Sequence, residues 1–100
     1  MAYKIQIQYD DMENIASMFD NFGSSTQEHI AKLEQLKGQV EGGGWVGVGA
    51  GKFLDEMDGE VLPQMKILQA GYETAGAQVR KISQMFEEAE QTILSYFASL

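Results

Sequence analysis

The sequence predicts an all-α fold, an antiparallel helical hairpin in which two long helices meet at a glycine-rich corner. Long segments on both sides of the chain's centre carry apolar residues at heptad spacing, which is typical of helices packed along a narrow seam. Between them, residues 42–51 hold six of the eleven glycines and the only tryptophan, Trp45. Glycine costs about 1 kcal/mol relative to alanine inside a helix. This stretch should therefore end one helix and reverse the chain.

The composition describes one small, acidic domain of one hundred residues with a formal net charge of −8. An apolar fraction of 44% is ordinary and argues against disorder. Negative charge disfavours nucleic acid and anionic membranes as partners, because both require a basic face. The absence of cysteine excludes disulfides, thiol catalysis and zinc sites built on thiolates. No run approaches the ~18 apolar residues that span a bilayer, and the N-terminus lacks the apolar core of a general secretory signal.

The first helix is expected over residues 10–41, after an extended segment over residues 1–9. Residues 3–9 alternate apolar and polar side chains with a period of two, which favours an extended conformation. Asp10 fits an N-cap, and Glu13 completes a pair that resembles a capping box. Two columns of residues seven apart should face inward: Met12, Phe19, Thr26, Leu33 and Val40, and Ile15, Phe22, His29 and Leu36.

The corner is expected over residues 42–48 and the second helix over residues 49–99. The inward columns of the second helix are Leu54, Val61, Leu68, Ala75, Ile82, Ala89 and Tyr96, and Met65, Tyr72, Val79, Phe86, Ile93 and Leu100. Pro63 removes one backbone donor near the start of this helix and is expected to kink it, because the heptad register continues across it. A full break at Pro63 is the alternative.

The lengths and the apolar pattern predict a dimer. At ~1.5 Å per residue the second helix spans roughly 75 Å and overshoots the first by about twenty residues. Apolar residues outside the columns widen the stripe beyond what one partner helix can cover, and a hairpin of this size buries little surface by itself. We therefore expect two hairpins to pair into a dimer. The hairpin or dimer seam should contain Phe19, Phe22, Leu33, Leu36, Phe53, Leu68, Tyr72, Val79, Phe86 and Ile93.

No motif supports catalysis, a cofactor or a metal. Gly42, Gly44 and Gly47 have the spacing of a dinucleotide-binding fingerprint, but that fingerprint requires a preceding strand in a parallel sheet. His29, the only histidine, lies at a predicted seam position, where we interpret it as hydrogen-bonded rather than metal-binding. The carboxylates of residues 55–60 suit the positive N-terminus of the second helix. We expect no enzyme, no cofactor and no metal.

The motif Trp45-x-Gly47, between two long helices in an acidic chain of one hundred residues, resembles the Trp-Xaa-Gly (WxG) family. Members of that family are small early-secreted-antigen-like substrates of the bacterial type VII (ESX) secretion system. Phe53, eight residues after the tryptophan, matches a recurrent aromatic position, and Gly49 stands where the family often has alanine. The resemblance implies helical hairpins that pair into antiparallel four-helix dimers and are exported folded, without a cleavable signal.

The sequence departs from the family at its C-terminal end. Family export signals usually pair the corner with a Tyr-x-x-x-Asp/Glu motif after the second helix, often contributed by the other protomer. Here Tyr96 is followed four residues later by Leu100. A partner could supply the motif, residues outside this sequence could carry it, or export could proceed without it.

These observations lead to the hypothesis of a non-enzymatic small secreted protein of the type VII pathway, acting as a dimeric substrate, chaperone or adaptor. The resemblance assigns Trp45 and Gly47 to the export signal. Expected partners are a second copy or a related small helical protein, and the secretion ATPase of the type VII machinery. The protein would be cytoplasmic before export and secreted or on the cell surface afterwards, by a route independent of a signal peptide. A membrane-active helical effector, or a partner or chaperone of a larger secreted toxin, are the alternatives.

Overall fold

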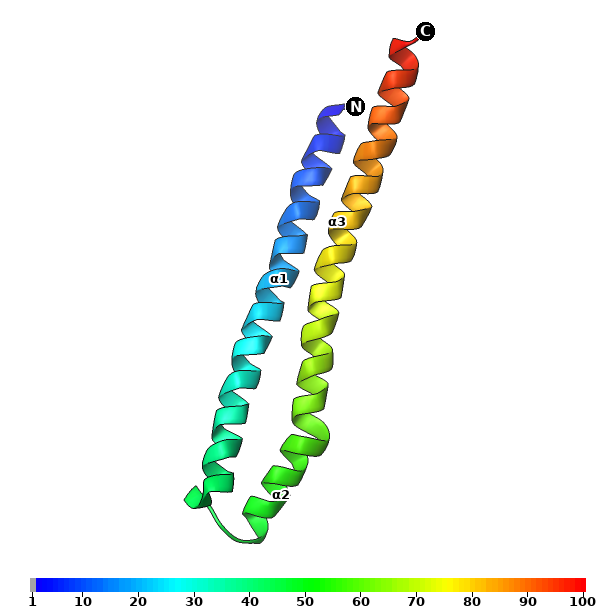
Figure 1. The fold of residues 1–100 in the computed structure, drawn as a ribbon. Helices are drawn as coiled ribbons and strands as arrows, with labels where there is room; N and C mark the ends of the chain where they lie inside the picture. Colours follow the sequence, from blue (N-terminus) through cyan, green and yellow to red (C-terminus); the bar gives the residue numbers. More distant parts are fainter. Residues whose placement is uncertain (1) are drawn as a thin grey trace. The chain divides into compact units, whose positions relative to one another are not determined.

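Two long helices make up most of the chain in the computed structural model, which describes the backbone of residues 2–100 and the side chains of residues 9–100. The first, α1, is Ala2–Gln39, and the last, α3, is Leu62–Ala98 (Figure 1). The described residues include no strand. The predicted all-α class with two long helices is therefore confirmed.

Short helical pieces connect the two long helices. A π-helical turn, η1, covers Val40–Gly44; the helix α2 covers Val48–Glu56; and a second π-helical turn, η2, covers Met57–Val61. Gly43 interrupts η1 with a φ of 92°, a conformation that glycine adopts without steric penalty. Trp45 follows in an extended conformation. The break in the helix thus falls within the glycine-rich stretch, and α2 begins one residue before the predicted start.

The start of α1 corrects one expectation. Because α1 begins at Ala2, the extended conformation predicted for residues 1–9 is wrong from residue 2 onward, and Met1 lies outside the described residues. A lone extended segment would leave its amides and carbonyls without partners, whereas a helix pairs these groups within the segment. Asp10 accordingly lies inside the helix and does not cap it. The earlier start also shortens the predicted overhang of the second helix.

The distortion expected at Pro63 lies just before it. Pro63 is the second residue of α3, so the alternative of a full break at this proline is wrong. Proline lacks an N–H and its ring collides with the carbonyl four residues earlier in a regular helix. Here the amide of Leu62 donates to the carbonyl of Met57, five residues earlier, which closes the wider turn η2. A wide turn of this kind inside a helix places Pro63 in the first turn of α3, where proline is tolerated.

Unit 1 is the first of two compact units into which the chain divides, and it contains residues 1–20 and 73–100. Polar pairs between described side chains link its helical segments, among them Tyr9 with Glu90, Glu13 with Arg80, and Asp20 with Arg80. The order of these pairs shows that the segments run antiparallel. The segments approach closely at Ala16, which is fully buried: a Cβ on Gly76 would lie 3.3 Å from the Ala16 carbonyl oxygen.

Unit 2, residues 21–72, contains the corner and an apolar core. Ile30, Met57 and Leu62 are buried, and four half-buried side chains pack against them: Leu33, Phe53, Val61 and Met65. Two ion pairs run in antiparallel order, Lys37 with Asp58 at 2.6 Å and Glu34 with Lys66 at 3.6 Å. Each unit is thus an antiparallel helical pair. The single hairpin domain expected from the sequence stays a prediction.

Candidate functional site

The candidate recognition site is the corner at the start of α2, in unit 2. Trp45 is extended, with φ −147° and ψ 127°, and its side chain is 49% exposed. Gly47 has φ 111° and ψ −171°, which residues with a side chain rarely adopt. Its carbonyl accepts the amide of Gly51 at 3.2 Å, which starts α2. A glycine two residues after the tryptophan is therefore what allows the chain to leave the extended conformation and enter the helix.

One edge of the indole rests on α2. A Cβ on Gly49 would lie 3.0 Å from Cζ2 of Trp45. Phe53 lies one turn further along the same face of α2, and its ring centroid is 6.0 Å from that of Trp45, with the rings tilted by 55°. Phe53 also packs against the unit 2 core. The indole is therefore held on one side by α2 and open to solvent on the other.

The corner surface around the indole is apolar. Val46 and Val48 are 77% and 78% exposed, on either side of Gly47. Exposed apolar groups beside a half-exposed tryptophan are typical of a protein-binding surface rather than of a reaction site. The roles of Trp45 and Gly47 in recognition stay predictions, and the structure gives the geometry in which they would act.

The residues of the predicted seam fall into two groups. Half-buried within their units are Phe19, Leu33, Phe53, Tyr72 and Val79. Exposed are Phe22, Leu36, Leu68, Phe86 and Ile93, with exposed fractions from 45% to 61%. In unit 2 the ring of Phe22 still reaches that of Tyr72, at a centroid distance of 5.4 Å. The seam was predicted as that of a hairpin or a dimer, and only the first group faces the interior of its own unit.

The inward position predicted for His29 is wrong, because its side chain is exposed. Within residues 9–39 of α1, the buried residues are instead Ala16, Gly23, Thr26 and Ile30. A straight helix turns every 3.6 residues and drifts by about 20° per heptad against a strict seven-residue repeat. Small side chains also permit the closest approach of two helices. Both effects favour burial of Ala16, Gly23 and Ile30. The column one residue earlier, which contains Ile15, Phe22 and His29, is left exposed.

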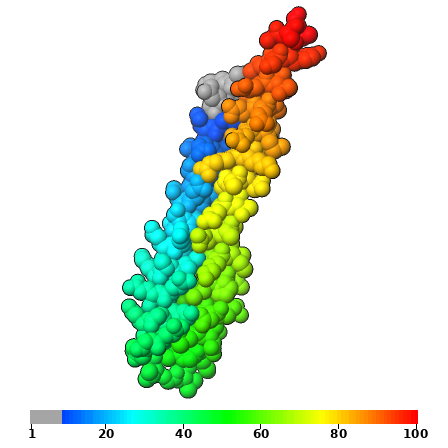
Figure 2. All heavy atoms as spheres, viewed as in Figure 1, coloured from blue at the N-terminus to red at the C-terminus, as the bar shows by residue number. Residues whose placement is uncertain are grey.

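Unit 1 leaves an apolar surface open near the C-terminal end of α3, where Figure 2 shows the last side chains in orange to red. We define the α3 apolar face as Ile82, Phe86, Ile93, Tyr96 and Phe97. These side chains are 43% to 63% exposed. Their spacing of three, four and seven residues places them on one side of the helix. Such a contiguous apolar surface is a candidate interface for a protein partner.

The corner motif has a counterpart among known protein families. The family model WXG100, described as proteins of 100 residues with WXG, matches residues 4–91. The chain belongs to the WXG100 family. Members are small secreted helical proteins of the type VII secretion system, and this WXG100 chain is accordingly a small secreted type VII substrate. No curated protein and no solved structure gives a significant match to it.

Polar contacts hold unit 1 of the WXG100 chain together. Arg80 pairs with Asp20 at 2.7 Å and with Glu13 at 3.2 Å, and these carboxylates raise the pKa of the guanidinium above its ordinary value. Tyr9 donates to Glu90 at 3.1 Å. Loss of hydration, and then the hydrogen bond to this carboxylate, raise the pKa of the Tyr9 hydroxyl. Sequence reasoning missed the role of Arg80, because its partners Asp20 and Glu13 lie 60 and 67 residues away along the chain.

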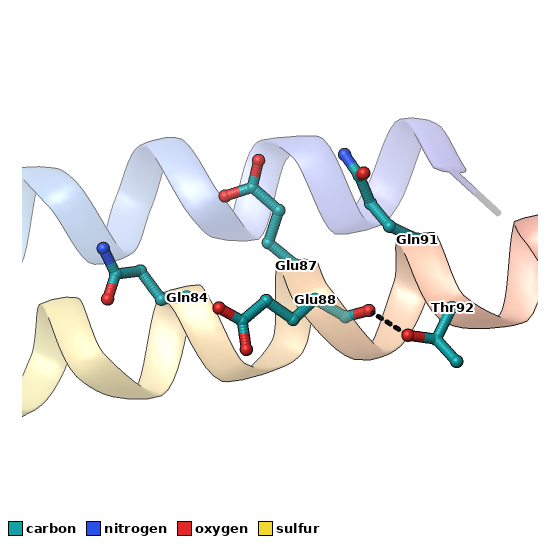
Figure 3. A pocket seen from close by; sticks show the side chains of 5 residues that line it. All are labelled: Gln84, Glu87, Glu88, Gln91 and Thr92. Carbon is teal, nitrogen blue, oxygen red and sulfur yellow. Dashed lines mark hydrogen bonds between the residues drawn. The ribbon is translucent and has the colours of Figure 1, made fainter.

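A shallow polar hollow of about 470 Å³ lies on α3 of unit 1 (Figure 3). It is lined by Gln84, Glu87, Glu88, Gln91 and Thr92. The Thr92 hydroxyl donates to the Glu88 carbonyl at 2.9 Å, within the helix. Within the part of the WXG100 chain that the structure describes, no three histidine, cysteine or acidic side chains group as metal ligands. Nor does any described helix combine the length and apolarity required to cross a membrane.

Proposed function

We propose that this WXG100 protein is a non-enzymatic, dimeric substrate, chaperone or adaptor of type VII secretion, and that its Trp45-x-Gly47 corner forms part of the export signal. The observation that carries the proposal is the half-exposed indole, 49% open while one edge rests on α2. Solubility does not require an exposed tryptophan, and a purely structural one would be more deeply buried. An indole that is held in place before binding loses little conformational freedom when a partner binds it.

The proposed reader of the corner is the secretion ATPase of the type VII machinery. Trp45→Ala should reduce export, or binding to this ATPase, while the helical circular dichroism is unchanged, because the indole is not part of the buried core. Ile67→Ala is the matched control, since Ile67 is an apolar residue of α3 in unit 2 that lies outside the corner and is 70% exposed. Secretion of Trp45→Ala at the wild-type level would exclude the signal role.

We further propose that a second copy covers the α3 apolar face and that two chains form a four-helix bundle. Family members typically pair with helical partners. A related small helical protein is the alternative partner, and coexpression with it would then be needed for a stable complex. Export would carry the folded pair from the cytoplasm to the cell surface or beyond, without a signal peptide. Such a partner, or residues outside this sequence, would supply the Tyr-x-x-x-Asp/Glu motif if export requires it.

The same apolar face raises the alternative of a membrane-active effector. Glu87, Glu88 and Glu90 lie on the same helical segment as this face, and the chain carries a net charge of −8. Negative charge opposes binding to anionic lipid, whereas interfacial helices generally carry lysine and arginine on their polar face. A protein partner is therefore favoured. Dye release from neutral or anionic vesicles at mildly acidic pH would support the alternative, and no release would exclude it.

A further inference from the structure

The polar contacts of unit 1 lead to an inference about how the chain opens. We infer that the ion pairs of Arg80 keep the two helical segments of unit 1 together, and that unit 1 opens as a separate unit when these ion pairs are lost. Unit 2 remains closed in this open state and continues to hold the corner. The inference concerns a conformational change of unit 1 and does not depend on the proposed role of the corner.

Unit 1 buries little apolar surface between its two segments. Among its described side chains, only Ala16 and Gly76 are buried, and the larger Phe19 and Val79 are half-buried. Unit 2, in contrast, has three large side chains buried in its core. Regions with few buried apolar contacts are the first to open locally. Unit 1 therefore depends on its polar contacts, and its opening would expose Phe19 and Val79 to a second chain.

Arg80 binds two carboxylates of the opposite segment. Its Nη2 atom lies 2.7 Å from Oδ2 of Asp20 and 3.2 Å from Oε1 of Glu13, and its Nε atom lies 3.4 Å from both carboxylate oxygens of Glu13. Glu13 and Asp20 are about two helical turns apart on one side of α1. The planar guanidinium can donate to both carboxylates at once. Such a network stabilises more than an isolated surface ion pair does.

The Arg80 ion pairs lie beside the close approach of the two segments. Gly76 precedes Arg80 by one turn of α3. A Cβ on Gly76 would lie 2.8 Å from Oδ1 of Asp20 and 3.3 Å from the carbonyl oxygen of Ala16. The absence of a side chain at Gly76 thus leaves room for the Asp20 carboxylate to extend over α3 toward the guanidinium. Loss of the ion pairs therefore acts at the place where the segments are in contact.

The next residue in α3 provides a matched control. Lys81 is exposed and makes no ion pair with another described residue. Arg80→Gln and Lys81→Gln each remove one positive charge from the chain. Any difference between the two variants therefore reports on the Arg80 ion pairs rather than on the net charge. Arg80→Lys is the conservative variant, because it keeps the positive charge but not the planar fork.

The test is hydrogen–deuterium exchange of the full chain, measured by mass spectrometry of peptides from each unit. Once separated, the segments of unit 1 lose the packing that supplies most of the stability of a helix. Arg80→Gln should therefore speed amide exchange in residues 9–20 and 73–98 by about three- to tenfold. Residues 21–72 should keep the wild-type rate. Lys81→Gln should match the wild type in both units, and Arg80→Lys should lie between the wild type and Arg80→Gln.

Three results would overturn the inference. Equal exchange in Arg80→Gln and Lys81→Gln would show that the Arg80 ion pairs have no specific effect on unit 1. Faster exchange of Arg80→Gln in both units would show that the chain opens as a whole. Exchange in Arg80→Lys as fast as in Arg80→Gln would show that the positive charge at this position does not hold the segments together.

Discussion

Unit 1 and unit 2 are both antiparallel helical pairs, but different interactions hold them. Unit 2 buries Ile30, Met57 and Leu62 in an apolar core. Unit 1 buries small residues, Ala16 and Gly76, and links its segments through polar pairs. Unit 1 also leaves the large side chains of the α3 apolar face exposed. In the function proposed above, the core of unit 2 fixes the corner that carries Trp45, and unit 1 offers the surface that a second chain would cover.

The largest effect expected is the loss of a core side chain from unit 2. Met57 is 4% exposed, so Met57→Ala should lower the free energy of unfolding by ~2–5 kcal/mol through lost burial and a cavity. Met85, 60% exposed in unit 1, gives the matched control, and Met85→Ala should change stability by less than ~1 kcal/mol. Urea unfolding followed by circular dichroism measures both. Equal losses would remove the contrast between the two units.

The next effect concerns the α3 apolar face. Phe86→Glu places a charge where we expect a second chain, so self-association should weaken by ~2 kcal/mol or more, which is roughly thirtyfold in Kd. Gln84→Glu adds the same charge in the polar hollow of Figure 3 and should leave association nearly unchanged. Sedimentation velocity over a dilution series measures both Kd values. If both substitutions weaken association equally, net charge and not the face governs it.

Gly76 tests the close approach in unit 1. A Cβ there would lie 2.8 Å from Oδ1 of Asp20 and 3.3 Å from the Ala16 carbonyl oxygen, so Gly76→Ala should destabilise by ~1–3 kcal/mol through overpacking. A Cβ added at Gly71, which also lies in α3, would meet nothing within 4 Å. Gly71→Ala should therefore stabilise by ~0.5–1 kcal/mol. The midpoint of thermal unfolding should therefore fall in Gly76→Ala and rise in Gly71→Ala. A shift of both midpoints in the same direction would contradict this geometry.

The smallest effect is a pH dependence at Tyr9. Its pKa is raised in the folded chain by lost hydration and by Glu90. The corresponding stabilisation is therefore complete below the ordinary tyrosine pKa and is lost as the pH rises through the higher folded value. Absorbance at 295 nm should show a late titration step that disappears in Tyr9→Phe and persists in Tyr96→Phe. If the late titration step remains in Tyr9→Phe, it belongs to another tyrosine and the prediction is wrong.

The sequence was sufficient to predict the class of the fold and the position of the corner. The class follows from the apolar residues that repeat along both long helices. The corner follows from its glycines, because glycine adopts a φ of 111°, as at Gly47, more readily than any other residue type. The inward face of α1 was predicted less well. Periodicity assigned Ile15 and Phe22 to the interior, but they are 45% and 47% exposed, and small residues occupy the close approach. Side-chain size, more than hydrophobicity, decides which face two helices can bring together.

Individual side-chain contacts could not be derived from the pattern. The indole's contact with Gly49 depends on the rotamer of Trp45 and on the turn at Gly47, and neither is encoded in spacing alone. The resemblance noted Gly49 only as a departure from alanine. Likewise, α1 begins at Ala2 because a helix pairs the backbone N–H and C=O groups of this segment. The alternating pattern of its side chains contains no information about these backbone hydrogen bonds.

The most direct test of the account is the mass of the purified chain in solution, measured by light scattering alongside Phe86→Glu. If a second copy covers the α3 apolar face, the wild type should have twice the chain mass of 11.1 kDa at micromolar concentration, and Phe86→Glu should shift toward the single-chain mass. A helical, cooperatively unfolding wild-type chain that stays at the single-chain mass would contradict the account.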